Sequence, residues 1–228
     1  LVSYILGRCA TVDEVKAEIA RVHIHGFDPR SSTVHWRFAE PSGRQIVLEI
    51  IDGKCVFYEN TLGVLTNSPS FDWQLTNLNN YVNLLPGRTE PHTLGNMSLS
   101  SFGGGSAMLG LPGDFTPPSR FVRAAFFQNT APQKPNAEES VFTAFHILGS
   151  MEIPIGAQFA VGEAPADIPS ATQCTCVSDM SGLRFYYRSM YDGGIRCIDL
   201  KEIDFKKIGL KSEPLIPSRK EFVHYIRF

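Results

Sequence analysis

The stretch Gln45-Ile-Val-Leu-Glu-Ile-Ile-Asp-Gly-Lys-Cys-Val-Phe-Tyr-Glu59 indicates the fold class, because a tight-turn dipeptide separates two strand-like runs. Asp52-Gly53 is typical of two-residue β-hairpin turns, whose backbone needs positive φ angles. Upstream, Val34 to Phe38 has alternating apolar positions and is joined to Gln45 through the turn Pro41-Ser-Gly43. The sequence therefore predicts three consecutive antiparallel strands.

Helix signals lie on both sides of these strands. Three helices are predicted: from Thr11 to near His23, from Pro118 to about Asn129, and from Asn136 through Leu148. Thr11 and Glu14 form a capping-box pair, and apolar residues recur after them at helical spacing. Asn136 is a favourable N-cap, with Glu139 three positions later.

The rest of the chain favours an antiparallel α+β fold. Three further strands are predicted: Gln173 to Ser178, Arg184 to Ser189, and Gly194 to Asp199. From Asn67 to about Pro118 we expect a long loop with a short helix around Leu75 to Leu84, and such loops are usually functional or mediate assembly. The order of strands, helices and strands, without βαβ alternation, predicts antiparallel sheets covered by helices. The 228 residues, 1–228, are expected to form one domain.

Composition argues against nucleic-acid and membrane partners. The net charge is -2, and the basic segment from Lys201 to Lys211 is interrupted by acidic residues, so we interpret it as a solvated surface. No stretch approaches the roughly 20 apolar residues that a membrane-spanning helix needs. The chain opens at Leu1 in an apolar run, and we expect this start to be an internal boundary of a longer protein.

Cysteine and histidine patterns predict neither a metal nor a cofactor. Of five cysteines, only Cys174 and Cys176 are close in sequence, and buried reduced thiols are a better interpretation than a metal site. The six histidines lack metal-ligand spacing, and no nucleotide-binding glycine motif follows a strand.

Two segments contain residues suited to chemistry. Gly63-Val-Leu-Thr-Asn-Ser-Pro69 places Asn67, an amide that can donate and accept hydrogen bonds, where a strand enters a polar turn. A Gly/Pro-rich loop then leads into a helix with Arg120 and Arg123 near its start. The residues alone leave a second interpretation open, in which Asn67 caps a turn and Arg120 pairs with a surface carboxylate.

Three longer motifs carry a resemblance to a known family: Gly63-Val-Leu-Thr-Asn-Ser-Pro69, Phe71-Asp-Trp-Gln-Leu-Thr-Asn-Leu-Asn-Asn-Tyr81, and Leu109-Gly-Leu-Pro-Gly-Asp-Phe-Thr-Pro-Pro-Ser-Arg-Phe-Val-Arg123. They resemble the choloylglycine hydrolase and penicillin V acylase family of N-terminal-nucleophile hydrolases. The resemblance implies an αββα sandwich, here a C-terminal portion without the N-terminal strands. It also implies hydrolysis of linear amides, such as conjugated bile salts or penicillin V, through a cysteine acyl-enzyme.

The resemblance assigns roles to two residues. Asn67 is similar to the family's oxyanion-hole asparagine, and Arg120 to the arginine that supports the nucleophile thiolate, with Arg123 as the fallback. The family's nucleophile is a cysteine that becomes residue one and uses its own α-amine as base. Cys9 does not match that position, so we expect the nucleophile to lie outside this chain and the chain alone to be inactive. The alternative is a non-catalytic binding or scaffold homologue that kept the fold.

The resemblance also suggests how substrate binding and assembly occur. The loop from His23 to Thr33 is similar to one that lines the acyl pocket, and its Phe27 with nearby Trp36 is expected to offer an aromatic surface. The segment Asn83 to Ser101 resembles an assembly loop, which implies a homotetramer. The loop beginning at Gly103 resembles the Gram-negative branch, and a periplasmic or a cytoplasmic location in a bacterium remains open.

Overall fold

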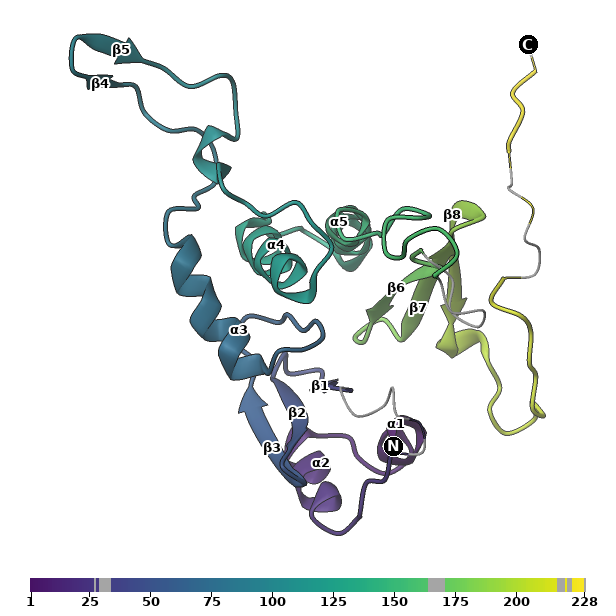
Figure 1. Ribbon diagram of the computed structural model, residues 1–228. Coiled ribbons are helices and arrows are strands. Elements are labelled where there is room, and N and C mark those ends of the chain that lie inside the picture. Colours follow the sequence, from purple (N-terminus) through teal and green to yellow (C-terminus); the bar gives the residue numbers. More distant parts are fainter. Residues whose placement is uncertain (27, 29–33, 164–170, 217–219, 221–222, 228) are drawn as a thin grey trace. The chain divides into compact units, whose positions relative to one another are not determined.

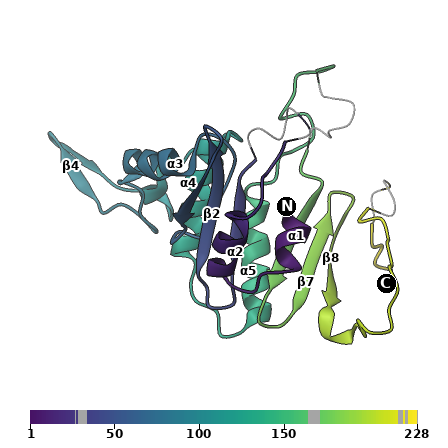
Figure 2. The same ribbon diagram turned by 90° about the horizontal axis from the view of Figure 1, so that it is seen from below.

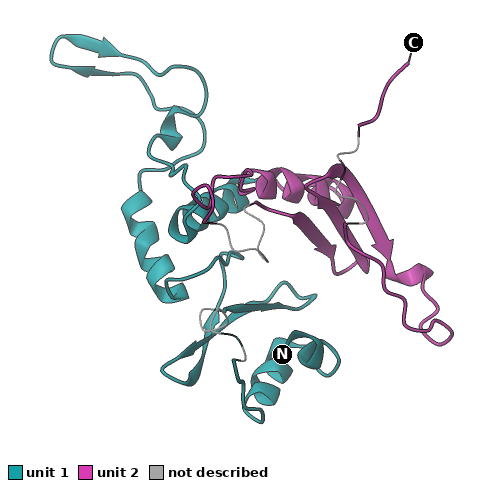
Figure 3. Ribbon diagram, turned by 45° about the vertical axis from the view of Figure 1, so that its right-hand side comes forward, with its two compact units in different colours: residues 1–131 teal, residues 132–228 magenta. Residues whose placement is uncertain are grey.

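The computed structural model describes residues 1–26, 28, 34–163, 171–216, 220 and 223–227, and it divides into two compact units, Leu1–Ala131 and Pro132–Phe228 (Figure 3). Each unit is described by itself. The elements of the first are α1 (Val2–Leu6), α2 (Val12–Ile19), β1 (Trp36–Ala39), β2 (Gln45–Ile51), β3 (Lys54–Glu59), α3 (Phe71–Asn77), η2 (Leu78–Tyr81), β4 (His92–Leu94), β5 (Met97–Leu99), η3 (Ser106–Met108) and α4 (Pro117–Thr130). Those of the second are α5 (Ala137–Gly149), β6 (Cys174–Asp179), β7 (Arg184–Ser189), β8 (Asp192–Asp199) and η4 (Leu200–Glu202). Among the described residues, no helix has both the length and the apolar character needed to cross a bilayer.

The first unit is built around a three-stranded antiparallel sheet in the order β1-β2-β3, as the sequence predicts. Successive side chains of a strand point to opposite faces, so the central strand β2 serves two cores. Ile46 and Leu48 pack with α1 and α2, while Val47 packs with α3 and α4. Figure 2 shows the two helix pairs on opposite sides of β2. Both faces of this sheet are therefore covered by helices.

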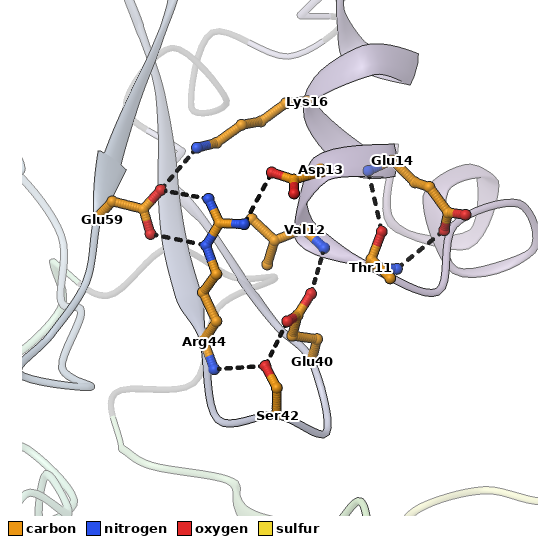
Figure 4. A network of polar contacts seen from close by, with 9 residues as sticks. All are labelled: Thr11, Val12, Asp13, Glu14, Lys16, Glu40, Ser42, Arg44 and Glu59. Atoms are coloured by element: carbon orange, nitrogen blue, oxygen red, sulfur yellow. Dashed lines mark hydrogen bonds and ion pairs between the residues drawn. The ribbon is translucent and has the colours of Figure 1, made fainter.

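A polar network joins α2 to the sheet (Figure 4). The carboxylate of Glu40 accepts a hydrogen bond from the Val12 backbone N–H at 2.7 Å, satisfying one of the free donors of the helix N-terminus. Arg44 contacts Asp13 of α2 and Glu59 of β3, each at 2.8 Å. These contacts fix the start of α2 against the β1–β2 turn and β3.

The predicted helix starts at Thr11 and Asn136 are confirmed, and α4 begins at Pro117, one residue before the predicted start. Both halves of the Thr11–Glu14 capping box are formed, and the Asn136 side chain accepts the Glu139 backbone N–H at 2.8 Å. The first helix ends at Ile19 rather than near His23. The apolar run at the chain start forms the short helix α1, which the sequence analysis did not predict as a helix.

The segment between Asn67 and Pro118 has more regular structure than the predicted long loop. Its helix α3 begins at Phe71, four residues before the expected start, and a 3₁₀ turn, η2, continues it to Tyr81. A hairpin of β4 and β5 follows, turning at Gly95, whose φ is 59° (Figure 1). The prediction missed this hairpin because its strands have three residues each and contain no buried position, so they leave no hydrophobic pattern.

In the described residues of the second unit, helix α5 accompanies an antiparallel sheet in the order β6-β7-β8. Helix α5 packs against β6, and its buried Phe145 has the guanidinium of Arg188 5.3 Å from its ring centroid. Arg188 also forms an ion pair with Glu152 at 2.8 Å. The three predicted strands are confirmed, with β8 starting two residues earlier, at Asp192.

Candidate functional site

The backbone that leads to Asn67 is held at a buried turn. Asn60, which is 4% exposed, accepts the Gly63 backbone N–H at 2.9 Å and donates to the Val64 carbonyl at 3.0 Å. Gly63 has a φ of 70°, a conformation that residues with a Cβ rarely adopt. Further along, the Thr66 hydroxyl donates to the Pro117 carbonyl at 3.1 Å, which ties this segment to the start of α4.

Arg120, in the first turns of α4, reaches the Asn67 side chain. Its Nε donates to the Phe115 carbonyl at 3.0 Å and its Nη2 to Asn67 Oδ1 at 2.7 Å. A guanidinium only donates hydrogen bonds, so the atom of the Asn67 amide that faces it is the oxygen. The amide N–H₂ of this exposed residue therefore points away from Arg120 and is free to donate to another group.

The local charge at this pair is positive. Burial lowers the pKa of the Arg120 guanidinium, and the neighbouring cation Arg123 lowers it further, but arginine stays charged at neutral pH. Among the described residues, the acceptors of Arg120 are a carbonyl and an amide oxygen rather than a surface carboxylate. The N-cap of α3 is Ser70, not Asn67. The acceptors of Arg120 thus differ from those expected if Arg120 pairs with a surface carboxylate.

Arg123 is instead held within the loop that precedes α4. It is 6% exposed, and its Nη1 donates to the carbonyls of Pro112 and Asp114 at 2.7 and 2.6 Å. Hydrogen bonds from Ser119 and Thr116 stabilise the Asp114 carboxylate and lower its pKa to about 2. These contacts fix the loop and explain why the arginine in contact with Asn67 is the one that lies three residues earlier.

The structure does not bring Trp36 to Asn67 and Arg120. Trp36 is paired with Leu48 and packs in the core on the α1–α2 face, where it lines an apolar cavity of about 190 Å³. Asn67 and Arg120 adjoin α3 and α4, which cover the other face. Phe27, the other residue expected at the acyl pocket, lies outside the described residues.

Two buried polar residues at helix α3, Gln74 and Glu49, were not predicted from the sequence. Gln74, which is 2% exposed, donates to the Asn67 carbonyl at 3.4 Å. Glu49, which is 3% exposed, accepts the Phe71 backbone N–H at 2.8 Å and contacts His35. Glu49 could have been noticed from the sequence, because it is a charged residue within the apolar run Ile46 to Ile51. Gln74 gives no such signal, because a glutamine on a short helix is usually exposed.

The thiols are not organised as a metal or nucleophile site. All five cysteines are free, and in the described part of the chain no group of three or more His, Cys, Asp or Glu side chains is placed to hold a metal ion. Burial raises the pKa of the Cys9 thiol, and the charges of Glu18 and Glu14 raise it further. Burial also raises the pKa of Cys176. Each environment disfavours the thiolate that a nucleophile requires.

Comparison with known proteins defines the class of the protein. The family model described as linear amide C-N hydrolases, choloylglycine hydrolase family, matches residues 1–213. The chain therefore belongs to the choloylglycine hydrolase family of linear amide C–N hydrolases. It is 35% identical over 204 residues to a bile salt hydrolase/transferase of Clostridium perfringens, which covers 87% of this chain and 60% of the relative. It is 31% identical over 226 residues to a penicillin V acylase of Pectobacterium atrosepticum, which covers 90% of this chain and 53% of the relative.

Solved structures agree with the predicted fold. A variant of the conjugated bile acid hydrolase from Clostridium perfringens aligns with a TM-score of 0.80 at 30% identity, over 96% of this chain and 66% of that one. Penicillin V acylase from Agrobacterium tumefaciens aligns with a TM-score of 0.65 at 25% identity, over 89% of this chain and 55% of that one. The predicted α+β class, with the antiparallel sheets of an N-terminal-nucleophile hydrolase, is confirmed. The chain spans about two thirds or less of the length of these relatives.

Proposed function

We propose that the protein carrying this chain hydrolyses linear C–N amide bonds and that this chain supplies half of the active site. Family membership supports the reaction class. The observation that carries the assignment is the 2.7 Å hydrogen bond from Arg120 to Asn67 Oδ1, because it turns the Asn67 N–H₂ outward as an oriented donor. A fixed donor beside a fixed positive charge suits an oxygen that becomes negative in the transition state.

The proposed reaction proceeds through a cysteine acyl-enzyme. The cysteine lies outside this chain, and its thiolate attacks the amide carbonyl carbon, which moves negative charge to the carbonyl oxygen. Asn67 donates to that oxygen, and Arg120 both holds the Asn67 amide and favours the thiolate electrostatically. The α-amine of the nucleophile residue, which became an ammonium by taking the thiol proton, returns that proton to the leaving amine as the C–N bond breaks. Water hydrolyses the thioester and restores the thiolate.

The names of the relatives suggest the substrate class. One relative is named a bile salt hydrolase/transferase and another a penicillin V acylase. A conjugated bile salt or a penicillin V type acyl amide is the proposed substrate, since apolar pockets discriminate weakly between acyl groups. We also propose a homo-oligomer assembled through the β4–β5 hairpin, which exposes Leu94 and Met97 at 69% and 66%. One domain, 1–228, remains the prediction for the chain.

The proposal is tested with the full-length protein and an Asn67→Ala variant. Removal of an oxyanion-hole donor typically lowers kcat about 10²- to 10³-fold, and this is the expected loss on penicillin V or a conjugated bile salt. Asn79→Ala is the matched control, because Asn79 is an exposed asparagine whose side chain donates to the carbonyl of Thr76 within its own helical turn. Unchanged turnover of Asn67→Ala would reject the role of Asn67. Absence of amide hydrolysis by the full-length wild type would favour a non-catalytic homologue.

A further inference from the structure

A buried carboxylate, Glu49, contacts the start of helix α3. Glu49 belongs to β2, a strand whose preceding residues Ile46, Val47 and Leu48 are fully buried. Glu49 is itself 3% exposed, and its Oε2 has no hydrogen-bond partner among the described residues. Burying a carboxylate is costly unless its contacts compensate, and an apolar residue of similar size is often no worse for stability. The contacts of Glu49 therefore need an explanation beyond core packing.

Glu49 takes the place of the missing side-chain cap of α3. The N-cap residue Ser70 makes no capping hydrogen bond, and its hydroxyl contacts Asp72 instead. Glu49 Oε1 accepts the Phe71 backbone N–H at 2.8 Å, and the carboxylate also interacts favourably with the positive end of the helix. His35, which precedes β1, contacts the same oxygen. The position of the first turn of α3 is thus set from the sheet.

The first turn of α3 also contacts the backbone of Asn67. Phe71 and Gln74 are three positions apart, so they share the buried face of the helix. Gln74 donates to the Asn67 carbonyl, and the Phe71 ring contacts the Phe121 ring at 6.0 Å between centroids. Phe121 directly follows Arg120 on α4, so this turn contacts the Asn67 backbone and the residue next to Arg120.

We infer that Glu49 is a positioning residue for the Asn67 amide and acts through the first turn of α3. The inference rests on the proposed function, because it assigns to Glu49 the task of holding the oxyanion donor in place. Donor geometry matters because the benefit of an oxyanion hole depends on donors fixed before the reaction. Among the described residues, His35 contacts Glu49, and burial raises the pKa of Tyr58 on β3, which the charges of Asp72 and Glu49 raise further.

A double-mutant cycle in the full-length protein tests the inference. Glu49→Leu removes the acceptor while filling the volume, and we expect kcat to fall about 10-fold with KM changed less than about 3-fold, since only a transition-state contact is disturbed. In an Asn67→Ala background the same change should alter kcat less than about 2-fold, because coupled residues are not additive. Glu49→Gln keeps an acceptor oxygen and should restore most of kcat. Glu59→Gln is the matched control, an exposed carboxylate on the neighbouring strand whose change should leave kcat unaltered.

The outcomes separate this inference from the proposed function. If Asn67→Ala leaves kcat unchanged, both the proposed function and the positioning role of Glu49 are refuted. If Asn67→Ala lowers kcat but Glu49→Leu does not, or lowers it equally in both backgrounds, only the positioning role is refuted. Should Glu49→Leu not fold, Gln74→Met tests the same route, because it removes the contact to the Asn67 carbonyl at nearly constant volume. Full additivity of Gln74→Met with Asn67→Ala would also overturn the inference.

Discussion

Replacement of Asn67 by aspartate separates its catalytic role from its structural role. The exchange keeps the oxygen that faces Arg120 at 2.7 Å and replaces the outward amide nitrogen by a second oxygen. The side chain therefore retains its partner and its shape, but it loses the only donors it can offer an oxyanion. We therefore expect Asn67→Asp to lower activity strongly and to leave the free energy of unfolding nearly unchanged.

The loss of activity has two components. Removing an oxyanion-hole donor costs about 3 to 4 kcal/mol of transition-state stabilisation. A carboxylate about 4 Å from the developing oxyanion adds a repulsion of about 4 kcal/mol at an effective dielectric constant of 20, and Arg120 offsets part of it. We therefore expect kcat of Asn67→Asp to fall at least about 10³-fold, which is as low as Asn67→Ala or lower.

The free energy of unfolding should hardly change. In Asn67→Asp the contact with Arg120 becomes an ion pair near the surface, and such pairs contribute about 0 to 1 kcal/mol. The expected result is thus an inactive protein at least as stable as the wild type. Single-turnover kinetics on penicillin V and a conjugated bile salt, with urea unfolding of the same samples, measure both quantities, and Asn79→Asp is the control. Activity within 10-fold of the wild type would refute the oxyanion role, and a large loss of stability would refute the orientation of the amide.

Two further predictions concern the elements that hold the site. Phe121→Ala should lower the free energy of unfolding by about 3 to 5 kcal/mol because Phe121 is fully buried, whereas Phe102→Ala, at a fully exposed position, should stay within about 0.5 kcal/mol; equal urea midpoints would contradict this. Hydrogen bonds from Ser119 and Thr116 lower the pKa of Asp114 to about 2, from an ordinary 3.8. The unfolded chain therefore binds this proton first, so the stabilisation is complete above about pH 4 and is lost as the pH falls toward 2. Asp114→Asn should flatten the unfolding free energy over that range, and an unchanged slope would exclude the contribution of Asp114.

Local signals account for the parts of the fold that the sequence predicted correctly. Three correct predictions are the Thr11 capping box, the Asn136 N-cap and the turn at Asp52-Gly53. Each depends on residues within four positions of one another, so it can be predicted from the local sequence. The β4–β5 hairpin could not be found this way because its strands bury nothing. Helix α3 was placed too late because its N-terminus is capped by Glu49, which lies 22 residues upstream.

The difference between local and long-range contacts also explains which parts of the site could be predicted from the sequence. Asn67 and Arg120 were chosen from motifs, but their contact spans 53 residues and is visible only in the structure. Trp36 was chosen as an aromatic residue near the acyl loop, yet a strand turns alternate side chains to opposite faces, and its partner Leu48 faces the α1–α2 core. The neighbouring residue His35 therefore faces the α3 side and meets Glu49. A shift of one position along β1 would exchange these two environments, so the register of the β1–β2 pair determines which side chain can act on Asn67.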